Sequence, residues 1–207
     1  MRPISKASFM SAFFTVFMFA SFQLSAQQND TAAKKLFIDV HQLDAGKVTY
    51  KDVEKAHAKD LAVEDKYGVK FLKYWFDEKK GMVFCLASAS DSDALRKTHA
   101  EAHGLLPERI YEITSANQNF PKDGKNLFLD IHYLNSGVSA KDVAAAHEKD
   151  LEVEKKYKVN FTNYLFDEKA AVVMCFAYAK DSSALAQTHK EAHGLIPAEV
   201  FEVKPGK

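Results

Sequence analysis

Cysteine and net charge are two features that this sequence largely lacks. The chain of 207 residues contains two cysteines, which are too few for a disulfide scaffold. Its 28 basic and 28 acidic residues cancel, so the charge balance gives no sign of binding to nucleic acid or to an anionic membrane. Apolar residues make up 47% of the chain and charged residues 27%, which is typical of a globular protein. Composition therefore excludes several classes of protein and indicates no activity.

Long apolar runs are also scarce, and the one present lies at the start of the chain. Arg2 and Lys6 form a basic start, residues 9–22 are apolar and uncharged, and Leu24-Ser25-Ala26 provides a small-residue end. This pattern predicts a signal peptide over residues 1–26, because a membrane span needs about 20 apolar residues. We therefore expect a periplasmic or secreted protein with no membrane partner after cleavage. An uncleaved anchor is the alternative interpretation of the same run.

The remainder of the chain repeats itself. LFIDVHQLDAG at 36–46 matches LFLDIHYLNSG at 127–137, and THAEAHGLLP at 98–107 matches THKEAHGLIP at 188–197. The polar segment between the copies contains proline and glycine and is typical of a linker. We predict a first repeat over 35–114, a linker over 115–126 and a second repeat over 127–204. Two similar units in one chain are expected to pair as an internal dimer.

Each repeat has the periodicity of a β-α-β-β-α-β unit. In the first copy the expected elements are a strand at 36–43, a helix at 49–67, strands at 69–76 and 82–89, a helix at 92–103 and a strand at 109–113. This order predicts an α+β fold of two ferredoxin-like repeats. Two helices cover one face of such a sheet, so we expect the bare faces to pack together as a pseudo-dimer, in the manner of a dimeric α/β barrel.

All eight histidines lie at matched positions of the two repeats. They are His41, His57, His99 and His103 in the first copy, and His132, His147, His189 and His193 in the second. Helical periodicity places His57, Asp60 and Glu64 on the apolar face of the helix at 49–67. The second copy repeats this group as His147, Asp150 and Glu154. Because such groups are costly to bury alone, they indicate either a metal site or a buried ion pair.

The second helix of each repeat carries two histidines four residues apart. This spacing places His99 and His103 side by side on one helix face, as helical metal sites require. The spacing also occurs by chance. Since His103 lies in the last helical turn, an alternative role is a charged C-terminal cap.

Asp39 and His41 share one side of the first strand. We expect Leu36, Ile38 and Val40 on the other side to face the helices. Asp39, His41 and Tyr74, with Asp130 and His132 of the second copy, would then line a pocket between the two sheets. A polar patch at the interface of the repeats is the alternative.

Cys85 and Cys175 occupy matched positions in the middle of two strands. Three roles are open to them. They would form a disulfide with each other in an oxidising compartment, act as soft metal ligands beside the histidines, or serve as small buried apolar residues.

The motifs DVH at 39–41, AHxxDLxxExKYGVxFxxYWFDExxGxVFCL at 56–86 and HxEAHGL at 99–105 resemble a family of small bacterial nickel-binding domains, first catalogued as a domain of unknown function. The resemblance covers residues 36–113 and 127–203. It implies a dimeric ferredoxin-like fold with nickel bound through histidines, and here the tandem would replace the dimer. The candidate ligands that it implies are His41, His57, Cys85, His99 and His103, with His132, His147, Cys175, His189 and His193.

We therefore predict a protein that sequesters, buffers or senses a divalent transition metal. The resemblance favours nickel, while copper and zinc are alternatives. Carboxylates are expected to orient the imidazoles or to add oxygen ligands, namely Asp39, Asp60 and Glu64 with Asp130, Asp150 and Glu154. The alternative function is a monooxygenase-like enzyme whose Asp39/His41/Tyr74 face binds a small organic molecule. A metal site should gather three or more imidazoles, whereas an enzyme should have an apolar pocket of roughly 300 Å³ or more.

Overall fold

The computed structural model describes residues 33–116 and 126–207. The predicted signal peptide and residues 117–125 of the predicted linker lie outside these ranges. The first repeat contains β1 (Lys35–Gln42), α1 (Tyr50–Val63), the 3-10 helix η1 (Glu64–Tyr67), β2 (Lys70–Asp77), β3 (Met82–Ala89), α2 (Ser92–Ala102), β4 (Arg109–Ile113) and β5 (Ser115–Ala116). The second contains β6 (Leu127–Tyr133), α3 (Ala140–Tyr157), β7 (Asn160–Asp167), β8 (Val172–Tyr178), α4 (Ser182–Ala192), β9 (Glu199–Glu202) and β10 (Lys204–Gly206).

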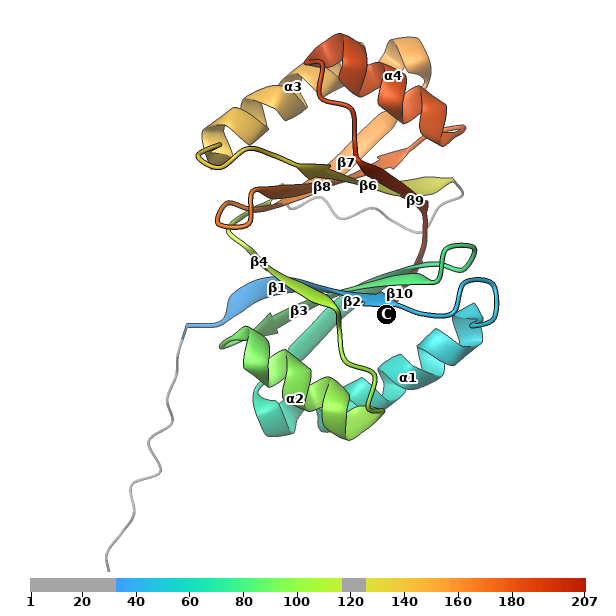
Figure 1. Ribbon diagram of the computed structural model, residues 1–207, viewed down its shortest axis with the longest axis vertical. Coiled ribbons are helices and arrows are strands. Elements are labelled where there is room, and N and C mark those ends of the chain that lie inside the picture. Colours follow the sequence, from blue (N-terminus) through green and yellow to red (C-terminus); the bar gives the residue numbers. More distant parts are fainter. Residues whose placement is uncertain (1–32, 117–125) are drawn as a thin grey trace, which may run out of the picture. The chain divides into compact units, whose positions relative to one another are not determined.

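The predicted α+β fold of two βαββαβ repeats is confirmed. Each repeat places its two helices on one side of its own antiparallel sheet (Figure 1). The predicted helix at 49–67 is divided, because the α-helix ends at Val63 and a 3-10 helix continues to Tyr67. Gly68 then adopts the left-handed conformation, with φ of 63°, and turns the chain into β2. Among the described residues, no helix has the length and apolar character of a membrane span.

Each sheet is completed by a short strand from the other repeat. The strand orders are β10-β2-β3-β1-β4 and β5-β7-β8-β6-β9. Ser115 and Ala116, predicted as part of the linker, instead form β5 on the edge of β7. Lys204, predicted as the end of the second repeat, begins β10 on the edge of β2. Buried edge strands have unpaired backbone groups, and this exchange satisfies them.

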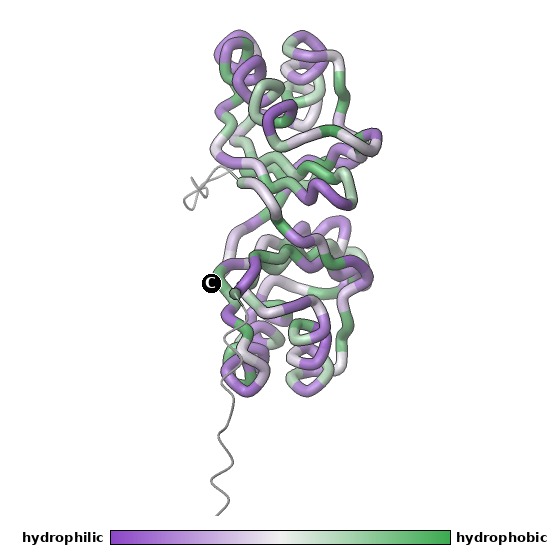
Figure 2. Tube along the Cα trace, turned by 90° about the vertical axis from the view of Figure 1, so that its left-hand side faces the viewer, coloured by the Kyte–Doolittle hydropathy of each residue, from purple (hydrophilic) through white to green (hydrophobic). Residues whose placement is uncertain are grey.

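The sheet faces without helices form one apolar cluster. Trp75 and Phe84 of the first repeat belong to it together with Phe176 and Phe201 of the second. The ring centroids of Trp75 and Phe176 lie 4.5 Å apart. In Figure 2 the strands are largely hydrophobic, whereas the helices alternate between hydrophobic and hydrophilic residues. The two repeats therefore bury their bare sheet faces, as predicted for a pseudo-dimer.

The predicted orientation of β1 is wrong. Ile38 and Val40 belong to the apolar cluster shared by the two sheets, whereas Asp39 faces the helices and contacts His99 of α2. Phe37, on the same face as Asp39, is also buried. Since β1 is buried on both faces, alternation shows which residues share a face and not which face meets the helices.

Tyr74 does share a face with Asp39 and His41, but this face lies beneath the helices. Phe71 and Tyr74, three residues apart, lie on this same face because the β2–β3 register shifts between Phe71 and Lys73. Such a bulge inserts one residue and reverses the alternation beyond it. The pocket predicted between the sheets is therefore replaced by a separate cavity inside each repeat.

Candidate metal centre

Three elements of each repeat bring the histidine cluster together. In the first repeat β1 supplies Asp39 and His41, α1 supplies Asp60 and α2 supplies His99. His103 is the C-cap residue that follows α2. The Asp91 carboxylate accepts a hydrogen bond from the Ala94 N–H and so fixes the start of α2. From this start the helical spacing places both imidazoles over the sheet face that carries Asp39.

His99 lies at the centre of this cluster and is 1% exposed. Its Nε2 lies 3.2 Å from Oδ2 of Asp39, and its Nδ1 lies 2.9 Å from Oδ1 of Asp60. His41 Nε2 lies 3.0 Å from the other oxygen of Asp39. His103 Nε2 lies 3.3 Å from Oδ2 of Asp60. Each carboxylate therefore bridges two imidazoles, and both carboxylates share His99.

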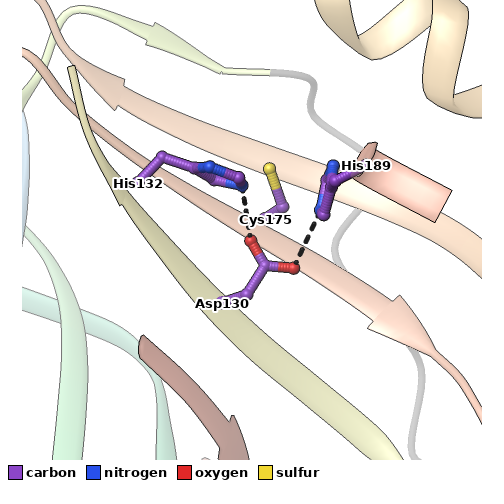
Figure 3. Close-up of side chains that lie close together, drawn as sticks. All are labelled: Asp130, His132, Cys175 and His189. Atoms are coloured by element: carbon purple, nitrogen blue, oxygen red, sulfur yellow. Dashed lines mark hydrogen bonds and ion pairs between the residues drawn. The ribbon is translucent and has the colours of Figure 1, made fainter. Parts of the chain in front are cut away.

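The second repeat reproduces the arrangement. Asp130 lies between His132 and His189, with Nε2 to oxygen distances of 3.1 and 3.3 Å (Figure 3). On the far side of His189, Nδ1 lies 2.9 Å from Oδ1 of Asp150. Asp150 in turn lies 3.3 Å from His193 Nε2. The two repeats therefore form the same cluster although their sequences differ at other positions.

The two carboxylates favour the charged form of the central histidine in each cluster. Burial opposes its charge, but the hydrogen bonds that His99 donates to Asp39 and Asp60 outweigh burial and raise the pKa of His99 to about 10. The same contacts to His41 and His99 overcome burial and lower the pKa of Asp39 to about 2. His189 and Asp130 show the same two shifts. Each cluster therefore holds opposite charges together inside the protein.

The donor atoms in each repeat fall into two groups that share one histidine. The atoms of Asp39, His41 and His99 lie within 4.8 Å of one another, as do those of Asp60, His99 and His103. Each described group brings together two imidazoles and one carboxylate rather than the three imidazoles predicted. Imidazole and carboxylate donors suit nickel, copper and zinc, so the residues present fit such an ion.

The tautomers distinguish the two groups. Nδ1 of His103 accepts a hydrogen bond from the Leu105 backbone N–H at 3.1 Å, so the ring proton lies on Nε2, toward Asp60. His193 has the same contact with Leu195. Asp60 also accepts the Nδ1 proton of His99, which directs Nε2 of His99 toward Asp39 and His41. In many metal sites a carboxylate accepts the proton of one ring nitrogen while the other ring nitrogen binds the ion. The contacts of His99 have this form, with Asp60 as the carboxylate, and they favour the Asp39/His41/His99 group as the ligand set.

The two thiols do not pair. Cys85 and Cys175 are both free and buried, each in the core of its own repeat, so the disulfide alternative is wrong. Burial and the nearby carboxylates hold the pKa of both thiols well above the usual value. Cys175 lies within the group of Asp130, His132 and His189. Because metals bind the thiolate, an ion would bind these thiols only with the loss of their protons.

His57 and Glu64 are buried, as the helical periodicity predicted, but lie outside the donor groups of the described residues. Burial lowers the pKa of His57, and its ring lies 4.7 Å from that of Tyr74. Glu64 accepts hydrogen bonds from the Phe71 N–H at 2.7 Å and from Lys70 Nζ at 2.7 Å. Their counterparts His147 and Glu154 are placed alike. Glu64 and Glu154 therefore join helix to strand rather than orient an imidazole.

A cavity opens onto each cluster from the solvent side. The cavity of the first repeat measures about 450 Å³ and that of the second about 210 Å³. Apolar residues that the sequence periodicity did not identify as cavity-lining contribute to the first cavity, namely Leu43, Val48, Val53, Ala56 and Leu105. The signal that was available is their match in the second repeat by Leu134, Val138, Val143, Ala146 and Leu195. Of these two cavities, the first exceeds the volume of roughly 300 Å³ expected of an enzyme pocket and the second does not.

A family model described as "Nickel responsive protein SCO4226-like" matches residues 37–113 and again residues 128–203. No curated protein matches the chain. The crystal structure of SCO4226 from Streptomyces coelicolor A3(2) is 32% identical and covers 39% of this chain and 96% of its own, with a TM-score of 0.37. This coverage corresponds to one repeat of the tandem.

Larger structures match both repeats together. Chlorite dismutase from Candidatus Nitrospira defluvii, in complex with imidazole, is 10% identical over 84% of this chain and 91% of its own, with a TM-score of 0.50. A putative monooxygenase from Fusobacterium nucleatum is 14% identical over 86% of this chain and 94% of its own, with a TM-score of 0.43. At 10% identity the likeness to chlorite dismutase concerns the fold alone, and the likeness to the monooxygenase, with a TM-score below 0.5, supports no inference.

Proposed function

The chain belongs to the family of nickel-responsive proteins similar to SCO4226, and on this basis we propose that it binds nickel, or a closely similar divalent metal, in each repeat. One observation carries the proposal. Two buried imidazoles and a carboxylate meet within 4.8 Å around His99, and their counterparts meet around His189. Buried groups of this kind must be paired or metal-bound, and here the donor atoms lie close enough together to hold one ion.

We assign the ligands to Asp39, His41 and Nε2 of His99, with Asp130, His132 and His189 in the second repeat. Asp60 accepts the Nδ1 proton of His99 at 2.9 Å and holds the ring in place. Access is through the cavity, because His41 and His99 line it. An incoming ion must displace the proton that His99 shares with Asp39, so binding releases protons and strengthens as the pH rises.

The physiological role we propose is sequestration, buffering or sensing of the metal in the periplasm or outside the cell. The basic start, apolar run and small-residue end of residues 1–26 support export. Two similar sites in one chain suit storage or buffering, since both would fill over a similar range of metal concentration. Copper and zinc compete for such donors, and the general affinity order places copper above nickel.

Isothermal titration of the purified protein with Ni²⁺, Cu²⁺ and Zn²⁺ tests the proposal. We expect two ions per chain, a Kd below roughly 10 µM and heats that depend on the buffer because protons are released. Binding weaker than this for all three metals would contradict the proposal. The double variant His41→Ala/His132→Ala should abolish binding, whereas Asp60→Asn/Asp150→Asn should weaken it about 10- to 100-fold.

The matched control is His57→Phe/His147→Phe. These histidines are buried beside the clusters yet lie outside the donor groups, so we expect the affinity for nickel to stay within about twofold. Far-UV circular dichroism of every variant establishes that it is folded. Equal loss of binding in the control and in His41→Ala/His132→Ala would refute the ligand assignment.

A further inference from the structure

We propose that the metal site of the first repeat keeps one coordination position open to its cavity, and that a small neutral nitrogen heterocycle, such as an azole, binds the ion at that position. The inference rests on the proposed function, because it requires the ion to be present. Two observations support it. The protein supplies three donor atoms to this site, and the cavity beside them is large enough for an organic ligand.

The donor set of the first repeat is smaller than the coordination number of the ions that it suits. Asp39, His41 and His99 each offer one ligand atom, and no described residue adds a fourth donor to this group within 4.8 Å. Nickel, copper and zinc ions take at least four ligands. Sites that hold a metal through three side chains leave the remaining position to water or to a molecule from outside the protein.

Other donor groups that line the cavity do not fill this position. Asp60 accepts the Nδ1 proton of His99 at 2.9 Å, and Nε2 of His103 lies 3.3 Å from Asp60. These contacts place Asp60 and His103 in the second donor group rather than in that of Asp39. The thiol of Cys85 lines the cavity but belongs to neither described group. The fourth ligand must therefore come from the cavity.

The open position faces the cavity. His41 and His99 line the cavity, whereas Asp39 is 0% exposed and does not. The cavity is therefore the route by which an ion reaches these three residues. The side of the ion that faces this route is not covered by Asp39, His41 or His99, so a molecule in the cavity can reach it.

The walls of the cavity determine the size of the ligand. Val53, Tyr74 and Val83 form a buried apolar wall, and Leu105, 49% exposed, lies at the mouth. An apolar cavity of about 150 Å³ holds a benzene ring. The first cavity, at about 450 Å³, therefore accommodates a molecule of two rings, whereas the second, at about 210 Å³, accommodates one. The second repeat also has Cys175 within its donor group, so a two-ring ligand should distinguish the repeats.

The charges around the site determine the type of donor atom. Asp39 and Asp60 are buried carboxylates, and their two negative charges balance the charge of a divalent ion. Among the described residues that line this cavity there is no lysine or arginine, whereas Asp44 and Asp52 are present. An anionic ligand would add an uncompensated charge, which is costly in an apolar cavity. A protonated amine has no free electron pair for the ion. A neutral azole avoids both problems, and nickel, copper and zinc all bind nitrogen donors of this type.

Isothermal titration of the nickel-loaded protein with 4-phenylimidazole tests the inference, because this azole has two rings and a neutral nitrogen donor. We expect one molecule to bind per chain, at least tenfold more tightly than to the metal-free protein, and to shift the visible absorption bands of the bound nickel. Benzoate, an anion, should bind at least tenfold more weakly. No binding of 4-phenylimidazole at millimolar concentration, equal affinity with and without nickel, or equal affinity for benzoate would overturn the inference.

Two matched variants test the assignment to the first repeat. Ala56 of α1 and Ala146 of α3 occupy equivalent positions and line the first and the second cavity. The indole ring of Ala56→Trp fills the first cavity and should abolish binding of 4-phenylimidazole, whereas Ala146→Trp should leave its affinity within about twofold. Val48→Trp and Val138→Trp make the same comparison from the loops before these helices. Loss of binding in both members of a pair, or in neither, would overturn the assignment.

Nickel content and far-UV circular dichroism are measured first for every protein, so the failure of this inference and that of the proposed function are distinguishable. Two bound nickel ions per chain without binding of 4-phenylimidazole would refute this inference alone. Absence of bound nickel from the folded native protein would refute the proposed function and this inference with it.

Discussion

Replacing Asp39 by Asn tests the central electrostatic feature of the fold. Asp39 is 0% exposed and lies between two imidazoles, at 3.0 Å from His41 and 3.2 Å from His99. Asparagine keeps the shape and one acceptor oxygen but removes the charge. In metal-free protein the change therefore isolates the part of the stability that depends on the carboxylate and the imidazolium.

The magnitude follows from the pKa of His99. A rise from 6.5 to about 10 corresponds to about 5 kcal/mol of stability, because each pKa unit is worth about 1.4 kcal/mol. Asp39 and Asp60 share this effect. Removal of Asp39 alone should thus lower the free energy of unfolding by about 2–3 kcal/mol near pH 6. Asp130→Asn should act similarly through His189, whose pKa is raised to the same value.

The destabilisation caused by Asp39→Asn should become smaller at both high and low pH. His99 in the native protein keeps its proton up to about pH 10, whereas the unfolded chain loses it near 6.5, so stability falls as the pH rises between these values. The difference between native protein and variant should shrink above about pH 8, as the native advantage disappears. It should shrink again below about pH 4, since Asp39, with a folded pKa of about 2, loses its stabilising effect as it becomes protonated.

Urea denaturation followed by circular dichroism, from about pH 3 to pH 10 in EDTA, measures this profile. Asp52→Asn is the matched control, because Asp52 is exposed and caps α1 through Thr49. Its penalty should be small and constant above about pH 5. A penalty for Asp39→Asn that is the same at every pH would refute the reasoning, because it would arise from packing rather than from charge.

Three further predictions concern other parts of the structure. Gly206→Ala should detach β10 and lower the Tm by several degrees in a thermal melt, because its Cβ would lie 2.0 Å from Cζ of Tyr74; an unchanged Tm would contradict the strand exchange. Glu64→Gln should destabilise the protein by about 1–2 kcal/mol in urea, since the buried charge that accepts the Phe71 N–H is lost, without changing nickel affinity. Cys175→Ser should leave nickel affinity within about twofold in calorimetry, because the raised pKa keeps its thiol protonated, and a large loss would identify Cys175 as a ligand.

Much of the site was predictable because helical periodicity is local. The spacing of His57, Asp60 and Glu64 predicted that all three are buried, and they are. The spacing of His99 and His103 predicted neighbouring imidazoles, whose nearest nitrogens lie 3.4 Å apart. Both inferences need only the geometry of one helix.

The partners of these residues were less predictable. Nothing in the spacing distinguishes Asp60, which contacts His99, from Glu64, which contacts the Phe71 backbone. His57 sits on the same face as Asp60 and yet packs against Tyr74 rather than joining the cluster. These differences depend on which strand and which helix cover each turn of α1, and that is a matter of tertiary packing.

The sequence by itself determined the repeat, the order of its elements and the residues that share each face, because these depend on periodicity along a short stretch of chain. Only the tertiary structure decided which face of β1 meets the helices. Both faces are buried, and the alternation of residues does not distinguish one buried face from the other. It also decided the bulge at Phe71 and the pairing of β5 and β10 with the opposite repeat. Those features arise where distant segments compete for the same backbone hydrogen bonds and apolar surface. Local sequence patterns do not predict the outcome of that competition.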